Sequence, residues 1–129
     1  MEILFEDKSV IVCLKERGLL SQEGKEGEPT MLSLLSAHTG GEIYPVHRLD
    51  KEVGGVMVFA KTKKAAADLS SQVTDRTMEK EYITVAEGSP EEKEGTMEDL
   101  LFFDRSKNKS FTVKKERRGV KKASLSYRV

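Results

Sequence analysis

The order of apolar and polar positions divides the chain into short strands and helices. Apolar runs rich in β-branched and aromatic residues, or runs that alternate apolar with polar residues, are typical of strands. Such runs cover residues 1–5, 10–14, 56–60, 80–88, 100–103, 110–114 and 123–129. Residues 21–28 are rich in glycine and charge and have no apolar period, which predicts an exposed loop.

Two helices are predicted between these runs. The first follows Thr30, whose side-chain oxygen can cap it, and Gly40 ends it. Its expected inner face, at a spacing of three to four, consists of Met31, Leu34, Leu35 and His38. The second helix is capped by Thr62. Its expected inner face consists of Ala66, Leu69 and Val73.

Composition indicates a polar globular protein of one domain. Apolar residues make up 37% of the 129 positions and charged residues 34%. Cys13 is the only cysteine and lies in an apolar run, so we expect a buried thiol. No apolar stretch is long enough to span a membrane, and the N-terminus lacks the apolar segment of a signal peptide. We therefore expect a cytoplasmic protein with no membrane partner.

Charge is distributed unevenly along a chain whose net charge is zero. Residues 104–129 contain ten lysines and arginines against two acidic residues, a net charge of +8, so residues 1–103 carry −8. A basic segment of this kind is typical of a surface that meets phosphate, and a solvated hairpin that is merely basic explains the charge equally well.

Residues 45–62 carry the densest candidate chemistry. His-Arg-Leu-Asp at residues 47–50 precedes Gly54 and Gly55, which permit a bend or a close approach of the backbone. The buried strand 56–60 follows at once. The carboxylate of Asp50 is thus expected in a turn braced by a strand, which is a rigid support for a reactive group.

The same residues resemble the signature motif of the RluA family of RNA pseudouridine synthases. The resemblance rests on residues 47–50, on Gly55 and on Ala-Lys at 60–61, all in register. Val-Gly at 53–54 departs from the Thr-Ser that the family often has there. The resemblance implies that Asp50 is the catalytic residue.

Further similarities extend the resemblance over essentially the whole chain. Lys80-x-Tyr82 is similar to a second family motif, and residues 15–18 are similar to a Lys-Pro-x-Gly turn in which Glu16 replaces the proline. The family implies an α+β fold, a mixed and mainly antiparallel sheet with a few helices, here incomplete at the C-terminus. Residues 1–129 are then expected to form part of one catalytic domain, without a separate N-terminal RNA-binding domain.

The chain ends before a Gly-Arg-x-His-Gln-Ile-Arg motif that family members carry, whose arginine pairs with the catalytic aspartate. We therefore expect the chain to be truncated and weakly active or inactive alone. A strand that ends at residues 127–129 leaves an unpaired sheet edge, which predicts self-association, or pairing with a complementary chain, through that edge.

The resemblance implies a role for each site residue, and each role has a simpler alternative. Asp50 acts as nucleophile or base, or is a turn aspartate that accepts bonds from its own backbone. Arg48 fills the space left by the target base, or forms a surface ion pair with Glu52 or another acid. Tyr82 stacks on the flipped uracil, or is an ordinary half-buried strand residue. His47 is expected to be a hydrogen-bonded structural imidazole.

The resulting function is isomerisation of uridine to pseudouridine in structured RNA, ribosomal or transfer. The family needs no cofactor, and the spacing of His38, His47 and Asp50 does not suit a metal. One alternative is a non-catalytic RNA-binding module that uses the basic hairpin 105–122. Another is a structural or oligomerising fragment without affinity for RNA.

Overall fold

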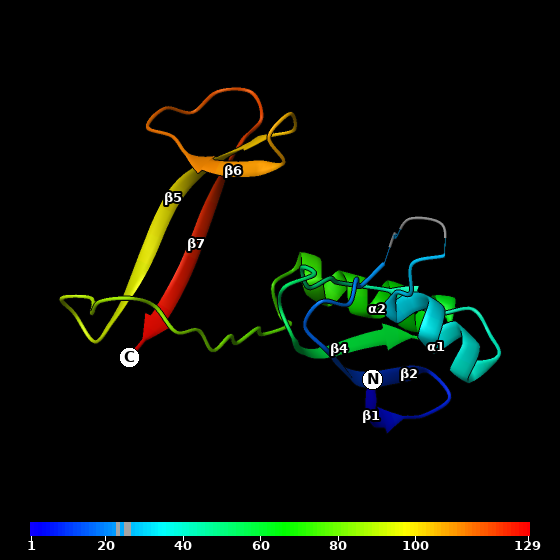
Figure 1. Ribbon diagram of the computed structural model, residues 1–129. Coiled ribbons are helices and arrows are strands. Elements are labelled where there is room, and N and C mark those ends of the chain that lie inside the picture. The colour runs from blue at the N-terminus through cyan, green and yellow to red at the C-terminus, as the bar shows by residue number, and fades with distance from the viewer. Residues whose placement is uncertain (23, 25–26) are drawn as a thin grey trace. The chain divides into compact units, whose positions relative to one another are not determined.

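The computed structural model describes residues 1–22, 24 and 27–129. The described chain forms two compact units, Met1–Glu81 and Tyr82–Val129 (Figure 1). Of the predicted loop 21–28, residues 23, 25 and 26 lie outside the described residues. Ser21, at its start, is buried rather than exposed, so the prediction is wrong there.

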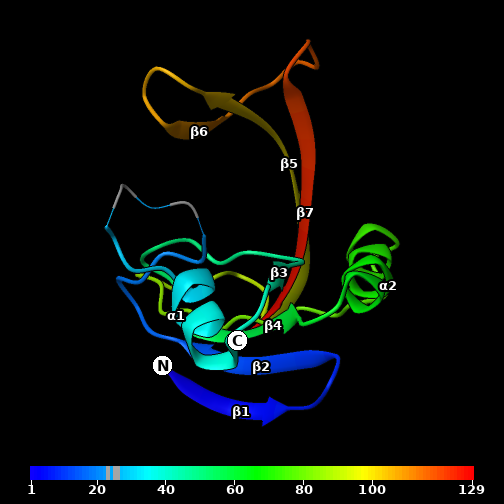
Figure 2. The ribbon, with the colours of Figure 1, turned by 90° about the vertical axis from the view of Figure 1, so that its right-hand side faces the viewer.

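The first unit contains a four-stranded antiparallel sheet in the order β1-β2-β4-β3 (Figure 2). Its strands are β1 (Glu2–Glu6), β2 (Val10–Lys15), β3 (Tyr44–Pro45) and β4 (Gly55–Ala60). β2 and β4 pair along their whole length, from Val10 opposite Ala60 to Lys15 opposite Gly55. The predicted strands 1–5, 10–14 and 56–60 are confirmed. β4, which lies between β2 and β3, begins immediately after the Asp50 turn.

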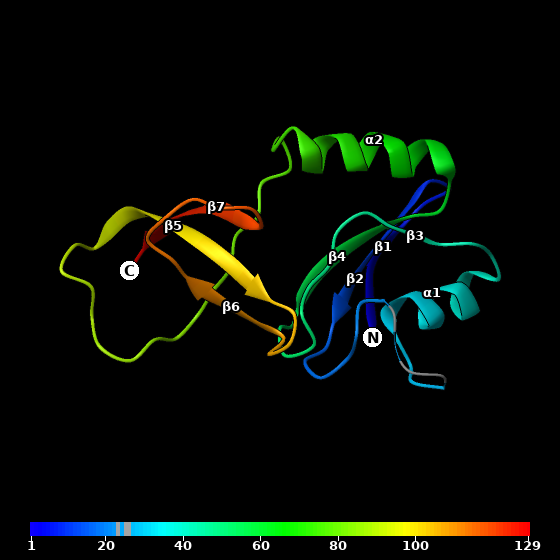
Figure 3. The ribbon, with the colours of Figure 1, turned by 90° about the horizontal axis from the view of Figure 1, so that it is seen from above.

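Two helices complete the first unit, and both begin at the predicted threonine. Helix α1 (Met31–Thr39) is capped by Thr30, whose Oγ1 accepts from the Ser33 amide at 3.1 Å, and it ends at Gly40 with φ of 67°. Helix α2 (Lys63–Thr74) is capped by Thr62, whose Oγ1 accepts from the Ala65 amide at 3.2 Å. α2 contacts β4 and β3 (Figure 3).

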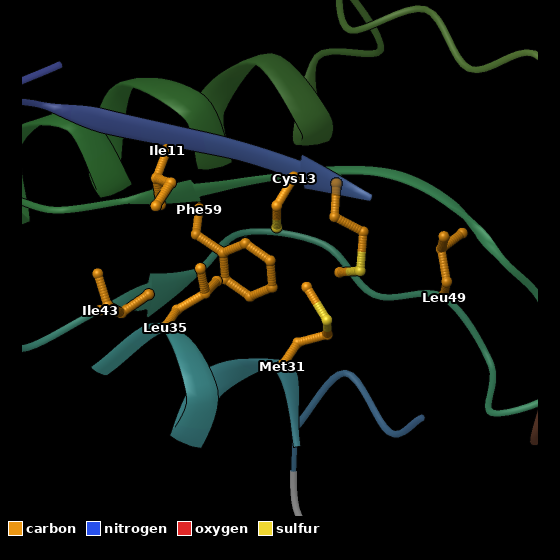
Figure 4. Packing of buried hydrophobic residues seen from close by; sticks show 8 residues of the cluster. Ile11, Cys13, Met31, Leu35, Ile43, Leu49 and Phe59 are labelled. Carbon is orange, nitrogen blue, oxygen red and sulfur yellow. The ribbon is translucent and has the colours of Figure 1, made fainter. Parts of the chain in front are cut away.

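The core of the first unit lies between α1 and the sheet. Met31 and Leu35 of α1 point towards the side chains of β2 and β4 (Figure 4), whereas Leu34 and His38 on the same predicted face are partly exposed. The buried cluster comprises Ile11, Cys13, Met31, Leu35, Ile43, Leu49, Met57 and Phe59. Cys13 is fully buried, as predicted, and burial raises the pKa of its thiol to about 11.

The second unit contains a three-stranded antiparallel sheet in the order β6-β5-β7. Its strands are β5 (Glu94–Asp104), β6 (Lys109–Thr112) and β7 (Val120–Arg128). β5 and β7 run side by side as a long ladder (Figure 1). β5 extends six residues further towards the N-terminus than the predicted strand 100–103. β7 lies at an edge of this sheet, and self-association through that edge stays a prediction.

The predicted strand 80–88 is wrong. The segment has no regular secondary structure, and the side chains of Ile83 and Val85 are 98% and 97% exposed. A strand needs a hydrogen-bonded neighbour, and no described strand pairs with this segment. Alternation of apolar and polar residues favours an extended backbone, but it does not provide the neighbouring strand that hydrogen bonding requires. The α+β class with antiparallel sheets and two helices is nevertheless confirmed, the strands being divided between two sheets.

Candidate active site

Asp50 lies in the loop between β3 and β4, and its side chain is exposed. The Val53 amide donates to the Asp50 carbonyl at 3.0 Å, which closes a turn directly before β4. Gly55 opens the strand with φ of 151°, a conformation that favours glycine. The carboxylate is therefore presented at the entrance of a buried strand, as the sequence predicted.

Leu49, the residue before Asp50, is anchored by its buried side chain and by hydrogen bonds to Ser21. The Leu49 side chain is buried in the core, and its backbone is held by the hydroxyl of Ser21. Ser21 Oγ donates to the Leu49 carbonyl at 2.6 Å and accepts from the Leu49 amide at 3.1 Å. One buried hydroxyl thus satisfies both backbone groups of the residue next to Asp50, which leaves that backbone little freedom to move.

We predict that Ser21→Ala lowers the free energy of unfolding of the first unit by about 1–3 kcal/mol, because it leaves two buried backbone groups without partners. Urea unfolding followed by circular dichroism measures the change. Ser70→Ala is the matched control, since Ser70 is exposed on α2, and it should change the free energy by less than about 0.5 kcal/mol. Equal effects of both substitutions would contradict the anchoring role of Ser21.

Lys15 holds the other side of the loop. Its side chain is 1% exposed, and Nζ donates to the carbonyls of Val53 at 2.6 Å, Glu16 at 3.1 Å and Lys51 at 3.2 Å. The Gly18 amide donates to the same Lys51 carbonyl at 2.8 Å. Three carbonyls therefore compensate the buried ammonium, and two of them, those of Lys51 and Val53, tie the last residue of β2 to the Asp50 turn.

Burial lowers the pKa of Lys15, and attraction to the carboxylates of Glu52 and Asp50 partly opposes that shift. The Lys15 ammonium thus places a positive charge next to the Asp50 loop, and it donates its three hydrogen bonds to backbone carbonyls. Gly54 fits closely against the same strand, because a Cβ there would lie 3.3 Å from the Lys15 carbonyl oxygen. This close approach accounts for one of the two glycines before β4.

The Asp50 carboxylate itself has no hydrogen bond or ion pair with any described residue. Two other aspartates show what the simpler alternative looks like. The Asp7 carboxylate accepts from the amides of Ser9 and Val10, both at 2.7 Å, and that of Asp104 accepts from the Ser106 amide at 2.9 Å. These are turn aspartates bonded to their own backbone, whereas only the backbone carbonyl of Asp50 takes part in its turn.

Arg48 is exposed two residues before Asp50 and likewise has no ion pair with a described residue. Glu52, its suggested partner, accepts instead from Arg17 Nε at 3.2 Å. The Arg48–Glu52 ion pair is therefore absent from the described part of the chain. The guanidinium and the Asp50 carboxylate lie on the same loop, both accessible to a ligand.

His47 is hydrogen-bonded within the first unit, as predicted. Its Nε2 accepts from the Val58 amide of β4 at 3.2 Å, so this nitrogen carries no proton. Burial, and secondarily the charge of Lys80, lower the pKa of His47. The neutral imidazole therefore attaches the start of the loop to the strand that supports it.

We predict that His47 makes the first unit less stable in mild acid. Its folded pKa lies below the unfolded value of about 6.5, so the unfolded chain binds the proton first and stability falls as the pH drops below that value. The slope approaches about 1.4 kcal/mol per pH unit for one proton. In urea unfolding at pH 7.5 and 5.5, His47→Gln should remove this loss and His38→Gln, at a partly exposed ion pair with Glu6, should retain it. A loss unchanged in His47→Gln would contradict the assignment.

Tyr82 belongs to the second unit and is not part of the loop described above. Its side chain is 59% exposed in the segment that has no strand, so it is not a half-buried strand residue. Lys15 and Ser21, by contrast, are positioning residues that sequence reasoning missed. The sequence of residues 15–18 indicates a turn and so hides the role of Lys15, and no pattern marks Ser21.

Among the described residues no group of three or more histidine, cysteine, aspartate or glutamate side chains is placed to hold a metal ion. None of the helices in the described part of the chain is long and apolar enough to cross a membrane.

The sequence profile of the RNA pseudouridylate synthase family matches residues 9–129. The match covers almost the whole chain, including the loop of Arg48 and Asp50, the strand that supports it and the sheet of the second unit. The chain therefore belongs to the RluA family of RNA pseudouridine synthases, a family of isomerases.

Individual relatives agree with this membership. The chain is 39% identical to the dual-specificity RNA pseudouridine synthase RluA of Vibrio vulnificus, over 80% of this chain and 42% of the relative. It is 34% identical to an uncharacterized RNA pseudouridine synthase of Bacillus subtilis, over 82% and 37% respectively. It is 33% identical to the ribosomal large subunit pseudouridine synthase D of Borreliella burgdorferi, over 98% and 42%. The chain thus spans about two fifths of the length of these curated relatives.

A solved structure shares the fold. The human RNA pseudouridylate synthase domain containing 4 superposes with a TM-score of 0.68 at 22% identity, over 99% of this chain and 53% of that structure. At this identity the likeness shows the fold alone.

Proposed function

We propose that this chain supplies the aspartate-bearing part of the catalytic domain of an RNA pseudouridine synthase, with Asp50 as the catalytic residue. One observation carries the proposal. The Asp50 carboxylate is exposed and unpartnered among the described residues, on a loop that buried groups hold from both sides. A structural aspartate would use its carboxylate in the fold, whereas a reactive one must keep it available.

The reaction needs a group of this kind. The N1–C1′ bond of uridine breaks and a C5–C1′ bond forms, while C5 loses a proton and N1 gains one, so the isomerisation balances without a further reactant. A carboxylate can attack the sugar or the ring as a nucleophile, or accept the C5 proton as a base. Rigid support by Lys15 and Ser21 keeps Asp50 oriented while the detached base turns.

Arg48 and Tyr82 are proposed to hold the substrate. The Arg48 guanidinium lacks a partner among the described residues, so it is free to stack where the target base leaves the helix or to pair with a phosphate. Tyr82 carries a ring that can stack on the flipped uracil. The Tyr82 side chain is exposed, which supports its availability for stacking on a base.

The proposed substrate is structured RNA, ribosomal or transfer. The name of one relative, a ribosomal large subunit pseudouridine synthase, supports ribosomal RNA. The basic segment 104–129, with net charge +8, supplies the attraction for phosphate. The same segment supports a second candidate, in which the hairpin 105–122 binds RNA and Asp50 is idle. The two candidates differ in whether a pseudouridine depends on this gene.

The test is to disrupt the gene in its native cell and to map pseudouridine across ribosomal and transfer RNA by chemical probing and sequencing. We expect one or a few uridines to remain unmodified, and a plasmid copy to restore them. Using the native gene tests the protein at whatever length the cell makes it. An unchanged pseudouridine map in the disrupted strain would overturn the proposal of an active synthase.

A further inference from the structure

One face of the β6-β5-β7 sheet carries a row of aromatic and apolar side chains. Phe102 of β5 lies opposite Phe111 of β6 and opposite Val120 of β7. Residues directly opposite each other in antiparallel strands share a face of the sheet. Leu100 and Lys122, which also lie opposite each other, project from the same side because they stand two residues from Phe102 and Val120.

Positive charges flank both rings of this row. Lys107 Nζ lies 5.6 Å and Lys109 Nζ 6.0 Å from the centre of the Phe111 ring, and Arg117 Cζ lies 4.8 Å from the centre of the Phe102 ring. These are cation–π distances. We define the aromatic–basic face by Phe102, Phe111, Lys107, Lys109, Arg117 and Lys122.

The two rings differ in accessibility. The Phe102 ring is partly buried beneath Arg117, whereas Phe111 is 38% exposed on a strand whose four residues all face solvent. An open hollow of about 430 Å³ continues the face beside Phe102 and is lined by Leu100, Glu116, Arg117, Val120 and Lys122. Phe111 is therefore the more accessible of the two rings, and a base that stacks on it displaces the ends of the Lys107 and Lys109 side chains that lie over it.

Charge on this face points to an anionic partner. Of its acidic neighbours, Glu116 pairs with Lys122 at 3.2 Å, whereas Asp104, opposite Lys109, accepts from Ser106 and keeps its negative charge. Lys107, Lys109 and Arg117 form no ion pair with a described residue, so their charge is available to phosphate. Accessible rings between free cations are what proteins use to bind single-stranded nucleic acid, where a base stacks and phosphates pair with lysine and arginine.

We propose that the aromatic–basic face binds an unpaired stretch of RNA, with one base stacked on Phe111 and the adjacent phosphates on Lys107 and Lys109. The choice of RNA rests on the proposed function. Stacking of this kind is tolerant of sequence, since every base has a flat face. The face would thus recognise unpaired strand next to the modified uridine rather than a particular base.

The experiment measures binding of fluorescein-labelled decauridylate and of a ten-base-pair RNA duplex to the chain by fluorescence anisotropy. We expect the single strand to bind more tightly than the duplex. Phe111→Leu, which removes the flat ring but keeps an apolar side chain, should weaken single-strand binding about tenfold. Phe111→Trp should restore it.

Two controls separate stacking from folding and from charge. Phe5→Leu replaces another exposed phenylalanine, on β1 of the first unit, and should leave binding unchanged. Replacing Lys107 and Lys109 together by methionine should reduce the slope of log affinity against log salt by about 1.4, at about 0.7 for each phosphate contact to a single strand. Circular dichroism of each variant confirms that the sheet is retained.

Several results would overturn the proposal. These are wild-type binding of the duplex at least as tightly as the single strand, no binding of either RNA, or equal binding by Phe111→Leu and wild type. A dimer that Phe111→Leu dissociates would assign the face to a second copy. Loss of a pseudouridine in the gene disruption, together with unchanged binding by Phe111→Leu, would remove this proposal and leave the proposed function standing.

Discussion

Asp50→Asn, introduced into the native gene, should abolish the pseudouridines that depend on this protein. The amide keeps the size and exposure of the side chain but is neither a nucleophile nor a base at neutral pH. Loss of a catalytic group of this kind lowers turnover by at least about a thousandfold. Chemical mapping of ribosomal and transfer RNA from the variant strain measures the loss.

Measurements of RNA affinity and of folding stability distinguish loss of catalysis from loss of binding or folding. RNA affinity and the unfolding curve of Asp50→Asn should match wild type, because the carboxylate forms no hydrogen bond or ion pair with a described residue. Asp99→Asn is the matched control, since Asp99 is also exposed, on β5, and it should retain every pseudouridine. A strain carrying Asp50→Asn with normal modification would show that Asp50 is not the catalytic residue.

Lys15→Met should lower the free energy of unfolding of the first unit by about 1–3 kcal/mol. Methionine retains most of the buried stem, so packing changes little, but the carbonyls of Val53, Glu16 and Lys51 lose their common donor. Two opposing contributions determine this change. Losing the three hydrogen bonds destabilises the unit, whereas removing the ammonium also removes the free-energy cost of burying a charge. Urea unfolding at pH 7 measures the net change.

Lys63→Met provides the control for Lys15→Met. Lys63 is the first residue of α2 and is exposed, so its loss should change the free energy by less than about 0.5 kcal/mol. The Asp50 turn should also become more mobile in Lys15→Met, seen as faster exchange of the Val53 amide hydrogen. Equal stability and equal exchange in Lys15→Met and wild type would show that the loop does not depend on this side chain.

Local signals in the sequence predicted the local features of the fold. Thr30 and Thr62 mark helix starts because a cap needs only the side chain and the next three residues. The apolar run 56–60 predicted β4, and the family motif placed Asp50 directly before it. Each of these inferences depends on residues close together in the chain, which is why the structure confirms them.

Features that depend on distant partners could not be derived in the same way. Ile83 and Val85 have the alternation of a strand, but pairing is decided by another segment, and no described segment supplies it. Ser21 serves Leu49, 28 positions away, and Lys15 serves Val53, 38 positions away. No periodicity connects such pairs, so the supports of the site became visible only in three dimensions.

The single thiol of Cys13 allows local opening of the first unit to be measured by alkylation. A fully buried thiol whose pKa is raised to about 11 exposes almost no thiolate to an alkylating reagent at neutral pH. Alkylation then proceeds only when β2 separates from its neighbours, and its rate follows the opening of the sheet that carries the Asp50 loop. Because the second unit contains no cysteine, the incorporated label measures opening of the first unit alone, without any engineered probe.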